Sequence, residues 1–258
     1  MKITMIQSAP TWADAEASLA RVEQLIGESP SADGYVLPEM FATGFCMQPE
    51  RFADPEGGAV LTRMRQLSAR YDAAIVGSVA VVDGGKSYNR MYFVSPDGTI
   101  ARYDKRHLFT YSGEDKHYAP GTERCIVDFR GVRFLLQVCY DLRFPVWSRN
   151  RGDYDAIIYI ASWPVARISA WDTLLPARAI ENQCYVVGVN RVGDDPACSY
   201  SGHSMAIDPR GTIVARCSES VEDVRTVTLD IDSLRRFRTK FPVIADADPF
   251  TIAFGTDL

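Results

Sequence analysis

Residues 134–145 read Phe-Leu-Leu-Gln-Val-Cys-Tyr-Asp-Leu-Arg-Phe-Pro. The apolar run at 134–138 follows a turn at Arg130-Gly131 and is long enough for one buried strand, and polar residues begin directly after it. Cys139 is therefore expected at the carboxyl end of a core strand, the edge where open α/β sheets form ligand-binding crevices. A cysteine in such a place is more commonly a small buried hydrophobe, so its position alone favours a structural role.

The elements predicted on either side of this stretch alternate between strand and helix. Apolar runs and alternating patterns predict strands at 2–7, 35–39, 73–82, 87–94, 99–103, 156–160, 185–190, 204–207, 212–215 and 225–230. Helical spacing predicts helices at 15–26, ended by Gly27, and at 60–71 and 169–182. This order indicates the α/β class. Hairpin turns at 96–98 and 208–211 follow comparable series of elements, which suggests two similar halves.

The composition indicates a single domain over residues 1–258. The chain of 258 residues is 47% hydrophobic, enough for one large core. Its net charge of −5 offers no basic field, so no nucleic-acid partner is expected. The absence of a signal-peptide pattern and of a membrane-length apolar run predicts a cytoplasmic protein without membrane contact. The six cysteines form no C-x-x-C pair and no metal-ligand spacing with the three histidines, so neither a metal nor another cofactor is expected.

Two charged residues also stand at the ends of predicted strands. Glu39 closes the strand at 35–39 and precedes an apolar aromatic loop that would give a general base poorly hydrated surroundings. Lys105 follows the strand at 99–103. Taken singly, each is more typical of a solvated charge. With Cys139 they form a set suited to nucleophilic catalysis, because a cation and a base can shift a thiol of pKa about 8.5 toward the attacking thiolate.

Five motifs are distributed along the chain: Leu-Pro-Glu-Met-Phe-x-x-Gly-Phe (37–45), Tyr-Asp-Lys-Arg-His-Leu-Phe (103–109), Cys-Tyr-Asp-Leu-Arg-Phe-Pro (139–145), Ala-Arg-Ala-Ile-Glu-Asn-Gln (177–183) and Asp-Pro-x-Gly (208–211). In these motifs the chain resembles the nitrilase superfamily of carbon–nitrogen hydrolases, whose Glu-Lys-Cys triad has the same order. The third motif and the closing Lys-Phe-Pro look most like the omega-amidase branch, which deamidates short monoamides of dicarboxylic acids. The resemblance covers the whole chain and implies a four-layer α-β-β-α sandwich.

The resemblance also implies roles for individual residues. Cys139 would attack an amide carbonyl, and Glu39 would accept the thiol proton. Lys105 and the backbone N–H of Tyr140 would stabilise the tetrahedral oxyanion. Glu114 would be a second glutamate that positions the substrate or holds Lys105.

A substrate pocket is expected around these groups, with Phe45, Tyr140, Arg143 and Trp163 as its binding residues. Arg143 follows the nucleophile by four positions, so it could bind a substrate carboxylate in a bidentate manner, or pair with Asp141 or another acid and order the turn. The expected substrate is the omega-amide of a 2-oxo dicarboxylic acid, such as 2-oxoglutaramate. It would be hydrolysed to the acid and ammonia through a cysteine thioester.

The chain ends with an apolar aromatic tail that begins at Phe241, within residues 241–258. Such a tail on a monomer would expose a hydrophobic patch. Together with the aromatic segment 144–147 and the family resemblance, it predicts a homodimer with an isologous interface.

Other functions are compatible with parts of this pattern. A nitrilase or another small-amide or carbamoyl hydrolase would use the same triad. A cysteine–histidine peptidase could use His203, and a thiol redox sensor would need only Cys139. A noncatalytic α/β binding protein would need none of the triad residues. Stoichiometric ammonia release from simple amides, abolished by Cys139→Ala, fits only the amidase.

Overall fold

The computed structural model describes residues 1–252 and contains two large β-sheets. Sheet A is formed by β1 (Lys2–Gln7), β2 (Gly34–Val36), β3 (Asp54–Pro55), β4 (Ala74–Asp83), β5 (Lys86–Val94), β6 (Ile100–Asp104) and β15 (Asp223–Thr228). Sheet B is formed by β7 (Ile126–Phe129), β8 (Val132–Val138), β9 (Ala156–Ala161), β10 (Tyr185–Asn190), β13 (Met205–Ile207) and β14 (Ile213–Arg216). A separate hairpin pairs β11 (Val192–Asp194) with β12 (Ser199–Ser201).

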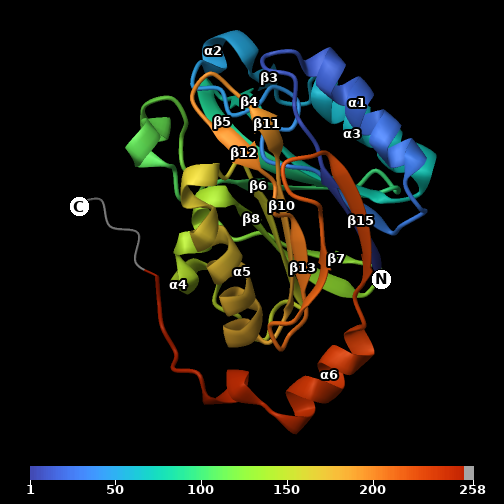
Figure 1. Cartoon of the computed structure of the whole chain (residues 1–258). Helices are drawn as coiled ribbons and strands as arrows, with labels where there is room; N and C mark the ends of the chain where they lie inside the picture. The colour runs from blue at the N-terminus through green and yellow to red at the C-terminus, as the bar shows by residue number, and fades with distance from the viewer. Residues whose placement is uncertain (253–258) are drawn as a thin grey trace.

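Helices cover the outer face of each sheet. The α-helices are α1 (Ala15–Glu28), α2 (Pro49–Phe52), α3 (Ala59–Tyr71), α4 (Pro145–Ser148), α5 (Ile168–Asn182) and α6 (Ile231–Lys240). In Figure 1, α1 and α3 lie on one side of the molecule and α5 on the other, with the two sheets between them. The four-layer α-β-β-α sandwich implied by the sequence is therefore confirmed.

Side chains that alternate along each strand produce these layers, and β8 shows how. Phe134, Leu136 and Val138 point into the core between the sheets. Leu135 points the other way and packs in the cluster that contains Trp171 of α5. Because successive residues of a strand face opposite sides, a strand buried on both faces needs the continuous apolar run that the sequence provides.

The two sheets share one strand order. Sheet A runs β15-β1-β2-β4-β5-β6 and sheet B runs β7-β8-β9-β10-β13-β14. In each, three parallel strands are followed by an antiparallel hairpin, and an antiparallel strand closes the opposite edge. The two similar halves suggested by the hairpin turns are present in the fold.

Several local predictions were wrong. Helix α1 does not end at Gly27 but continues to Glu28. A Cβ at residue 27 would lie 3.2 Å from the Tyr71 hydroxyl, so this glycine permits the close approach of α1 to α3. Helix α2, strands β3 and β7 and the β11–β12 hairpin were not predicted, because they are too short to show a clear period.

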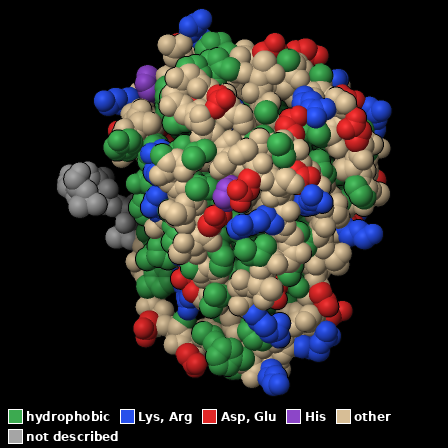
Figure 2. Space-filling model, viewed as in Figure 1, with side chains coloured by type: hydrophobic (Ala, Val, Ile, Leu, Met, Phe, Trp, Pro, Cys, Tyr) green, Lys and Arg blue, Asp and Glu red, His purple; other side chains and the backbone are tan. Residues whose placement is uncertain are grey.

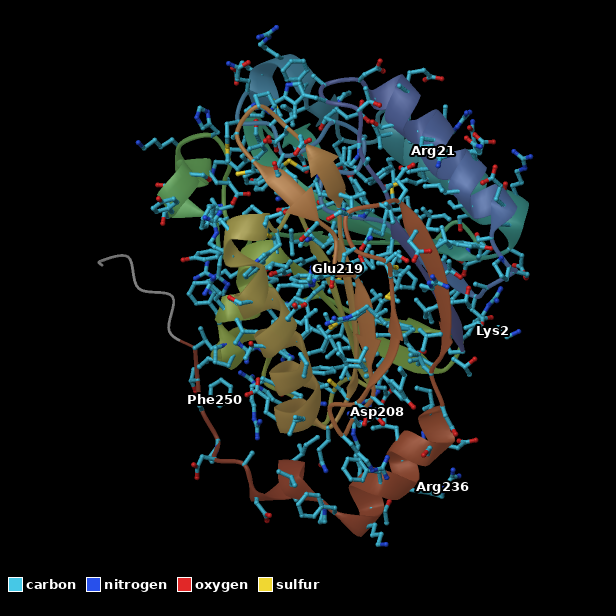
Figure 3. The ribbon with its side chains drawn as sticks, in the orientation of Figure 1. Lys2, Arg21, Asp208, Glu219, Arg236 and Phe250 are labelled. Atoms are coloured by element: carbon cyan, nitrogen blue, oxygen red, sulfur yellow. The ribbon has the colours of Figure 1, made fainter. Side chains whose placement is uncertain are left out.

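The described part of the C-terminal tail passes along the α4–α5 side of the molecule (Figure 1). Figure 3 shows Phe250 on this segment, with Arg236 on the preceding α6. The Gln183 side chain donates a hydrogen bond to the Phe241 carbonyl at 2.7 Å, and the Arg151 guanidinium lies 4.7 Å from the centre of the Phe250 ring. Residues 253–258 of the predicted tail lie outside the described residues.

Candidate active site

Cys139 lies where the sequence predicted, directly after β8, as the first residue of a 3₁₀ turn (Cys139–Arg143). Its backbone has φ +47°, in the left-handed region that non-glycine residues rarely adopt. Such a conformation persists only where the surroundings enforce it, and it is commonest at functional sites. The sharp turn carries the thiol out of the strand and into a cavity.

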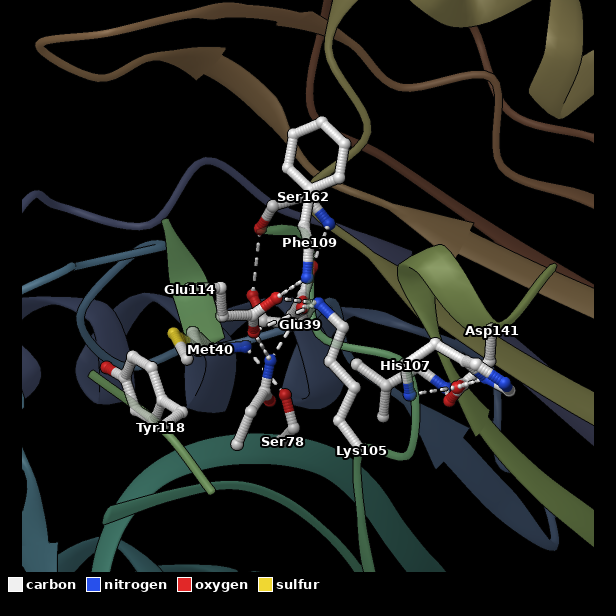
Figure 4. Close-up of polar contacts among 12 residues, drawn as sticks. Glu39, Met40, Ser78, Lys105, His107, Phe109, Glu114, Tyr118, Asp141 and Ser162 are labelled. Atoms are coloured by element: carbon white, nitrogen blue, oxygen red, sulfur yellow. Dashed lines mark hydrogen bonds and ion pairs between the residues drawn. The ribbon is translucent and has the colours of Figure 1, made fainter. Parts of the chain in front are cut away.

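Asp141 fixes this turn against the segment that carries Lys105. The buried carboxylate accepts hydrogen bonds from the Val138 N–H at 3.0 Å and the Tyr103 hydroxyl at 2.8 Å. It also accepts from the backbone N–H of His107 at 2.9 Å and from its ring Nδ1 at 2.8 Å, which must therefore carry the proton (Figure 4). Asp141 thus joins the end of β8 to β6 and the loop that follows it.

A buried charge cluster lies beside the cysteine. The side chains of Glu39, Lys105 and Glu114 converge in Figure 4, and each is 0% exposed. Lys105 Nζ donates to Glu39 at 2.9 Å and to both oxygens of Glu114 at 3.0 and 2.8 Å. Asn89 of β5 joins the two carboxylates by donating to Glu39 at 2.7 Å and to Glu114 at 3.2 Å. The fold thus brings together three charged residues that were predicted from separate parts of the sequence.

Backbone donors orient the two carboxylates. The second oxygen of Glu39 accepts the Ser162 N–H at 2.7 Å, and that of Glu114 accepts the Phe109 N–H at 2.6 Å. Glu39 was expected to be the last residue of its strand, but β2 ends earlier, at Val36. It lies in the following turn, in which Met40 has φ +45°.

The charges shift the pKa values of this cluster in a definite pattern. Burial disfavours the ammonium form of Lys105, but the charges of Glu114 and Glu39 outweigh burial and raise its pKa well above the usual value. Burial raises the pKa of Glu114, although Lys105 opposes this effect. Burial and the negative charge of Glu39 raise the pKa of the Cys139 thiol well above its usual value, although Lys105 again lowers it. These effects oppose the expected shift toward the thiolate, because burial and Glu39 outweigh the charge of Lys105.

The thiol opens into a cavity of about 280 Å³. Six of the eight predicted site residues line it: Phe45, Lys105, Cys139, Tyr140, Arg143 and Trp163. Glu39 and Glu114 do not line the cavity, but each contacts Lys105, which does. The other lining residues are Met47, Phe109, Tyr111, Ser112, Ser162, Pro164, Arg167, Asp195, Ala197, Cys198 and Tyr200.

Arg143 does not form the ion pair with Asp141 that would order the turn, because Asp141 bonds Val138, Tyr103 and His107 instead. Within residues 1–252 the Arg143 side chain makes no hydrogen bond or ion pair, and its guanidinium lies 5.0 Å from the centre of the Trp163 ring. The backbone of Trp163 is itself fixed, because its N–H donates to the side-chain oxygen of Asn190 at 2.7 Å. Arg143 therefore presents free donors at the cavity.

Several residues that complete the site were not predicted from the sequence. Asn89 was read as part of an ordinary strand, although a polar residue amid the apolar alternation of β5 was an available signal. Asp195 and Cys198 reach the cavity from the unpredicted β11–β12 hairpin. Ser162 contributes through a backbone N–H, which leaves no sequence signal.

His203 lies elsewhere, so the cysteine–histidine peptidase hypothesis is wrong. Its ring bonds Asp172 at 3.0 Å and lies 3.6 Å from Glu219, and it does not line the cavity. No cluster of His, Cys, Asp and Glu in the described part of the chain is arranged to hold a metal ion. No helix formed by residues 1–252 is both long enough and apolar enough to cross a membrane.

A sandwich with a cysteine beside a buried Glu-Lys-Glu cluster is the arrangement implied by the resemblance to carbon–nitrogen hydrolases. The sequence profile of the carbon-nitrogen hydrolase family matches residues 2–239, and the chain belongs to this family. It is a hydrolase that acts on carbon–nitrogen bonds other than peptide bonds.

Individual relatives are similar to this chain over most of its length. The chain is 47% identical to the omega-amidase YafV of Yersinia enterocolitica over 253 residues, which cover 98% of each protein. It is 35% identical to the 2-oxoglutaramate amidase of Bacillus subtilis over 224 residues, 85% of this chain and 86% of the relative. Among solved structures, XC1258 from Xanthomonas campestris, a CN-hydrolase superfamily protein with an arsenic adduct in its active site, superposes with a TM-score of 0.95. The two chains are 38% identical, and the matched region covers 98% of this chain and 99% of XC1258.

Proposed function

We propose that this protein is an omega-amidase that hydrolyses a small carboxylate-bearing amide, such as 2-oxoglutaramate, to the acid and ammonia. One observation carries the proposal. A single cavity holds the Cys139 thiol beside the buried Glu39–Lys105–Glu114 cluster and also holds the unpaired guanidinium of Arg143. The names of the two relatives support the same substrate class.

The first half of the reaction forms a thioester. Because burial and Glu39 raise the pKa of the Cys139 thiol, the thiol proton passes to Glu39 as the sulfur attacks the amide carbon. Lys105 and the Tyr140 N–H donate to the carbonyl oxygen as it becomes negative. The charges of Glu114 and Glu39 raise the pKa of Lys105 and so favour its charged form. When the carbon–nitrogen bond breaks, Glu39 returns the proton to the nitrogen, and ammonia leaves.

The second half consumes water. Glu39 takes a proton from a water molecule that attacks the thioester carbonyl, and the same donors stabilise the second oxyanion. Breaking the carbon–sulfur bond releases the acid, and the proton on Glu39 returns to Cys139. Glu114 holds Lys105 in place through two hydrogen bonds and contacts no reacting atom in this scheme.

Arg143 binds the carboxylate at the far end of the substrate. Its guanidinium is supported by an aromatic ring and carries no competing carboxylate, so its donors can form a bidentate pair with an incoming anion. Phe45, Tyr140 and Trp163 supply the walls around the substrate chain.

An amide panel tests the proposed function. Ammonia release would be measured with 2-oxoglutaramate, glutaramate, the neutral butyramide and butyronitrile, for the wild type and for Cys139→Ala. We expect turnover of the two carboxylate-bearing amides, a much lower kcat/KM for butyramide, and no turnover by the variant. Acid quenching should trap an acyl adduct on Cys139, visible by intact mass. Equal rates on charged and neutral amides, or a preference for the nitrile, would contradict the proposal.

We also propose a cytoplasmic homodimer whose interface includes the C-terminal tail. Hydrophobic side chains gather in Figure 2 along the edge over α4 and α5, where Val146 is 56% and Ile180 is 54% exposed. The tail passes this edge, and Phe241 is 59% exposed. All six cysteines are free thiols, which suits a reducing compartment. Light scattering should show a dimer, and truncation after Lys240 should weaken both association and activity; a fully active monomer would contradict the dimer.

A further inference from the structure

A second arginine lines the cavity and has no role in the scheme above. The Arg167 guanidinium lies 4.9 Å from the centre of the Phe109 ring and 5.9 Å from that of Tyr111. No hydrogen bond or ion pair of this side chain occurs within the described residues. Like Arg143, it is held by aromatic faces and keeps its donors free.

Trp163 contacts both arginines. The ring of Trp163 supports the Arg143 guanidinium, and its indole N–H donates to the Arg167 carbonyl at 2.8 Å. Arg167 is also the last residue of the 3₁₀ turn Val165–Arg167, whose backbone N–H bonds the Pro164 carbonyl at 3.0 Å. The backbone that carries the second guanidinium is therefore fixed relative to the first.

Asp195, an acidic residue of the cavity wall, does not neutralise the charges of Arg143 and Arg167. Asp195 accepts the Tyr200 hydroxyl at 2.6 Å and the N–H groups of Ala197 and Cys198 at 2.8 Å each. Arg191, on the buried side, lies 3.8 Å from the same carboxylate. With Lys105 compensated by two glutamates, the two arginines leave the cavity with an excess of positive charge and hydrogen-bond donors.

We propose that Arg167 is a specificity-determining residue that recognises the 2-oxo group beside the substrate carboxylate, and so selects 2-oxo acid amides over 2-amino acid amides. The inference rests on the proposed function and deepens it. One guanidinium is enough for a lone carboxylate, whereas a 2-oxo acid presents a third acceptor oxygen beside the two of its carboxylate. A 2-ammonio group offers only donors and a positive charge, so it would face the donors and charge of Arg167 without any acceptor.

The test compares three amides that differ only at the carbon next to the carboxylate: 2-oxoglutaramate, glutaramate and glutamine. The variant is Arg167→Met, which keeps most of the length and removes the charge. The matched control is Arg210→Met, since the Arg210 guanidinium also stacks on an aromatic ring, 4.4 Å from the centre of Phe237, but does not line the cavity.

We expect Arg167→Met to lower kcat/KM for 2-oxoglutaramate by roughly 10- to 100-fold more than for glutaramate, the scale of one charge-assisted hydrogen bond. The disadvantage of glutamine relative to glutaramate should shrink in the same variant, and Arg210→Met should change neither ratio. Equal losses on 2-oxoglutaramate and glutaramate would overturn the inference, because Arg167 would then act on the carboxylate or on the cavity as a whole.

A binding measurement separates this inference from the proposed function. In the Cys139→Ala background, calorimetry should show tighter binding of 2-oxoglutaramate than of glutaramate, and adding Arg167→Met should remove the difference. If wild-type turnover showed no preference for carboxylate-bearing amides, the proposed function would fail on its own. If the two ligands bound Cys139→Ala equally, the inference about Arg167 would fail whatever the turnover.

Discussion

Asp141→Asn tests how the site is held together. In the wild type, one carboxylate oxygen accepts the Tyr103 hydroxyl and the Val138 N–H, and the other accepts two donors of His107. An asparagine must turn its NH₂ group toward one of these pairs. Each pair contains a backbone N–H that cannot rotate away, so one fixed donor is left facing another donor in either orientation.

The structure sets the size of the effect. Losing one charge-assisted bond costs about 1.5–3 kcal/mol, and the remaining donors then bond a neutral acceptor, at about 1 kcal/mol less each. Relief of the desolvation of a buried charge offsets part of this loss, which leaves about 3–5 kcal/mol. That is a large fraction of the total stability of about 5–15 kcal/mol typical of a domain.

Urea unfolding followed by circular dichroism measures the stability loss, and steady-state ammonia release measures the catalytic one. Because Asp141 joins the cysteine turn to the lysine loop, kcat should fall by roughly 100-fold, the effect of a misplacement of about 1 Å, with a smaller change in KM. Asp97→Asn, in the turn between β5 and β6, removes a carboxylate that caps one exposed backbone N–H and is the matched control. A variant at 141 with wild-type kcat and an unfolding free energy within about 1 kcal/mol of wild type would refute the reasoning.

Glu39→Gln and Lys105→Met should each lower kcat by about 100-fold or more in folded protein, because one removes the general base and the other an oxyanion donor; near wild-type ammonia release by either would contradict the mechanism. Arg143→Lys should lower kcat/KM for glutaramate more than for butyramide, by about 1.5–3 kcal/mol, and equal losses would assign this arginine to structure. Burial raises the pKa of Asp155, but hydrogen bonds and charges from two flanking arginines outweigh burial and hold it below its usual value of 3.8. Its contribution to stability is therefore present above pH 3.8 and is lost as the pH falls through the lower pKa of the folded state. Asp155→Asn should be less stable than wild type at neutral pH, and the gap in unfolding free energy should close in acid; a gap that stays constant with pH would show that charge is not the cause.

The elements with strong periodicity could be predicted from the sequence, and the short ones could not. Strand β8 and helix α3 lie within one or two residues of their predicted bounds, because each has a long apolar pattern. Gly27 was misread because a glycine near a helix end usually terminates the helix, whereas here it makes room for Tyr71. The four-layer arrangement came from the resemblance and not from periodicity, which does not determine how two sheets pack.

The site was predictable where residue type carries the chemistry. Glu39, Lys105 and Cys139 were predicted as one set because they stand near strand ends in a recognisable order, and the structure brings them together. The upward shift of the Cys139 pKa was not predictable, because it depends on burial and on the charges that the fold brings beside the thiol. Arg167 was missed because a lone arginine before a helix is an ordinary surface residue until the fold turns it into the cavity.

The shared strand order of the two sheets has a consequence for how the enzyme loses activity. Glu39, Asn89 and Lys105 belong to sheet A or to the turns after its strands, whereas Cys139 and Ser162 follow strands of sheet B. Neither half contains both a nucleophile and a base. A slight sliding of one sheet over the other would separate sulfur from carboxylate while every backbone ladder stayed intact. Under mild urea or hydrostatic pressure, ammonia release should therefore disappear before the far-ultraviolet circular dichroism changes.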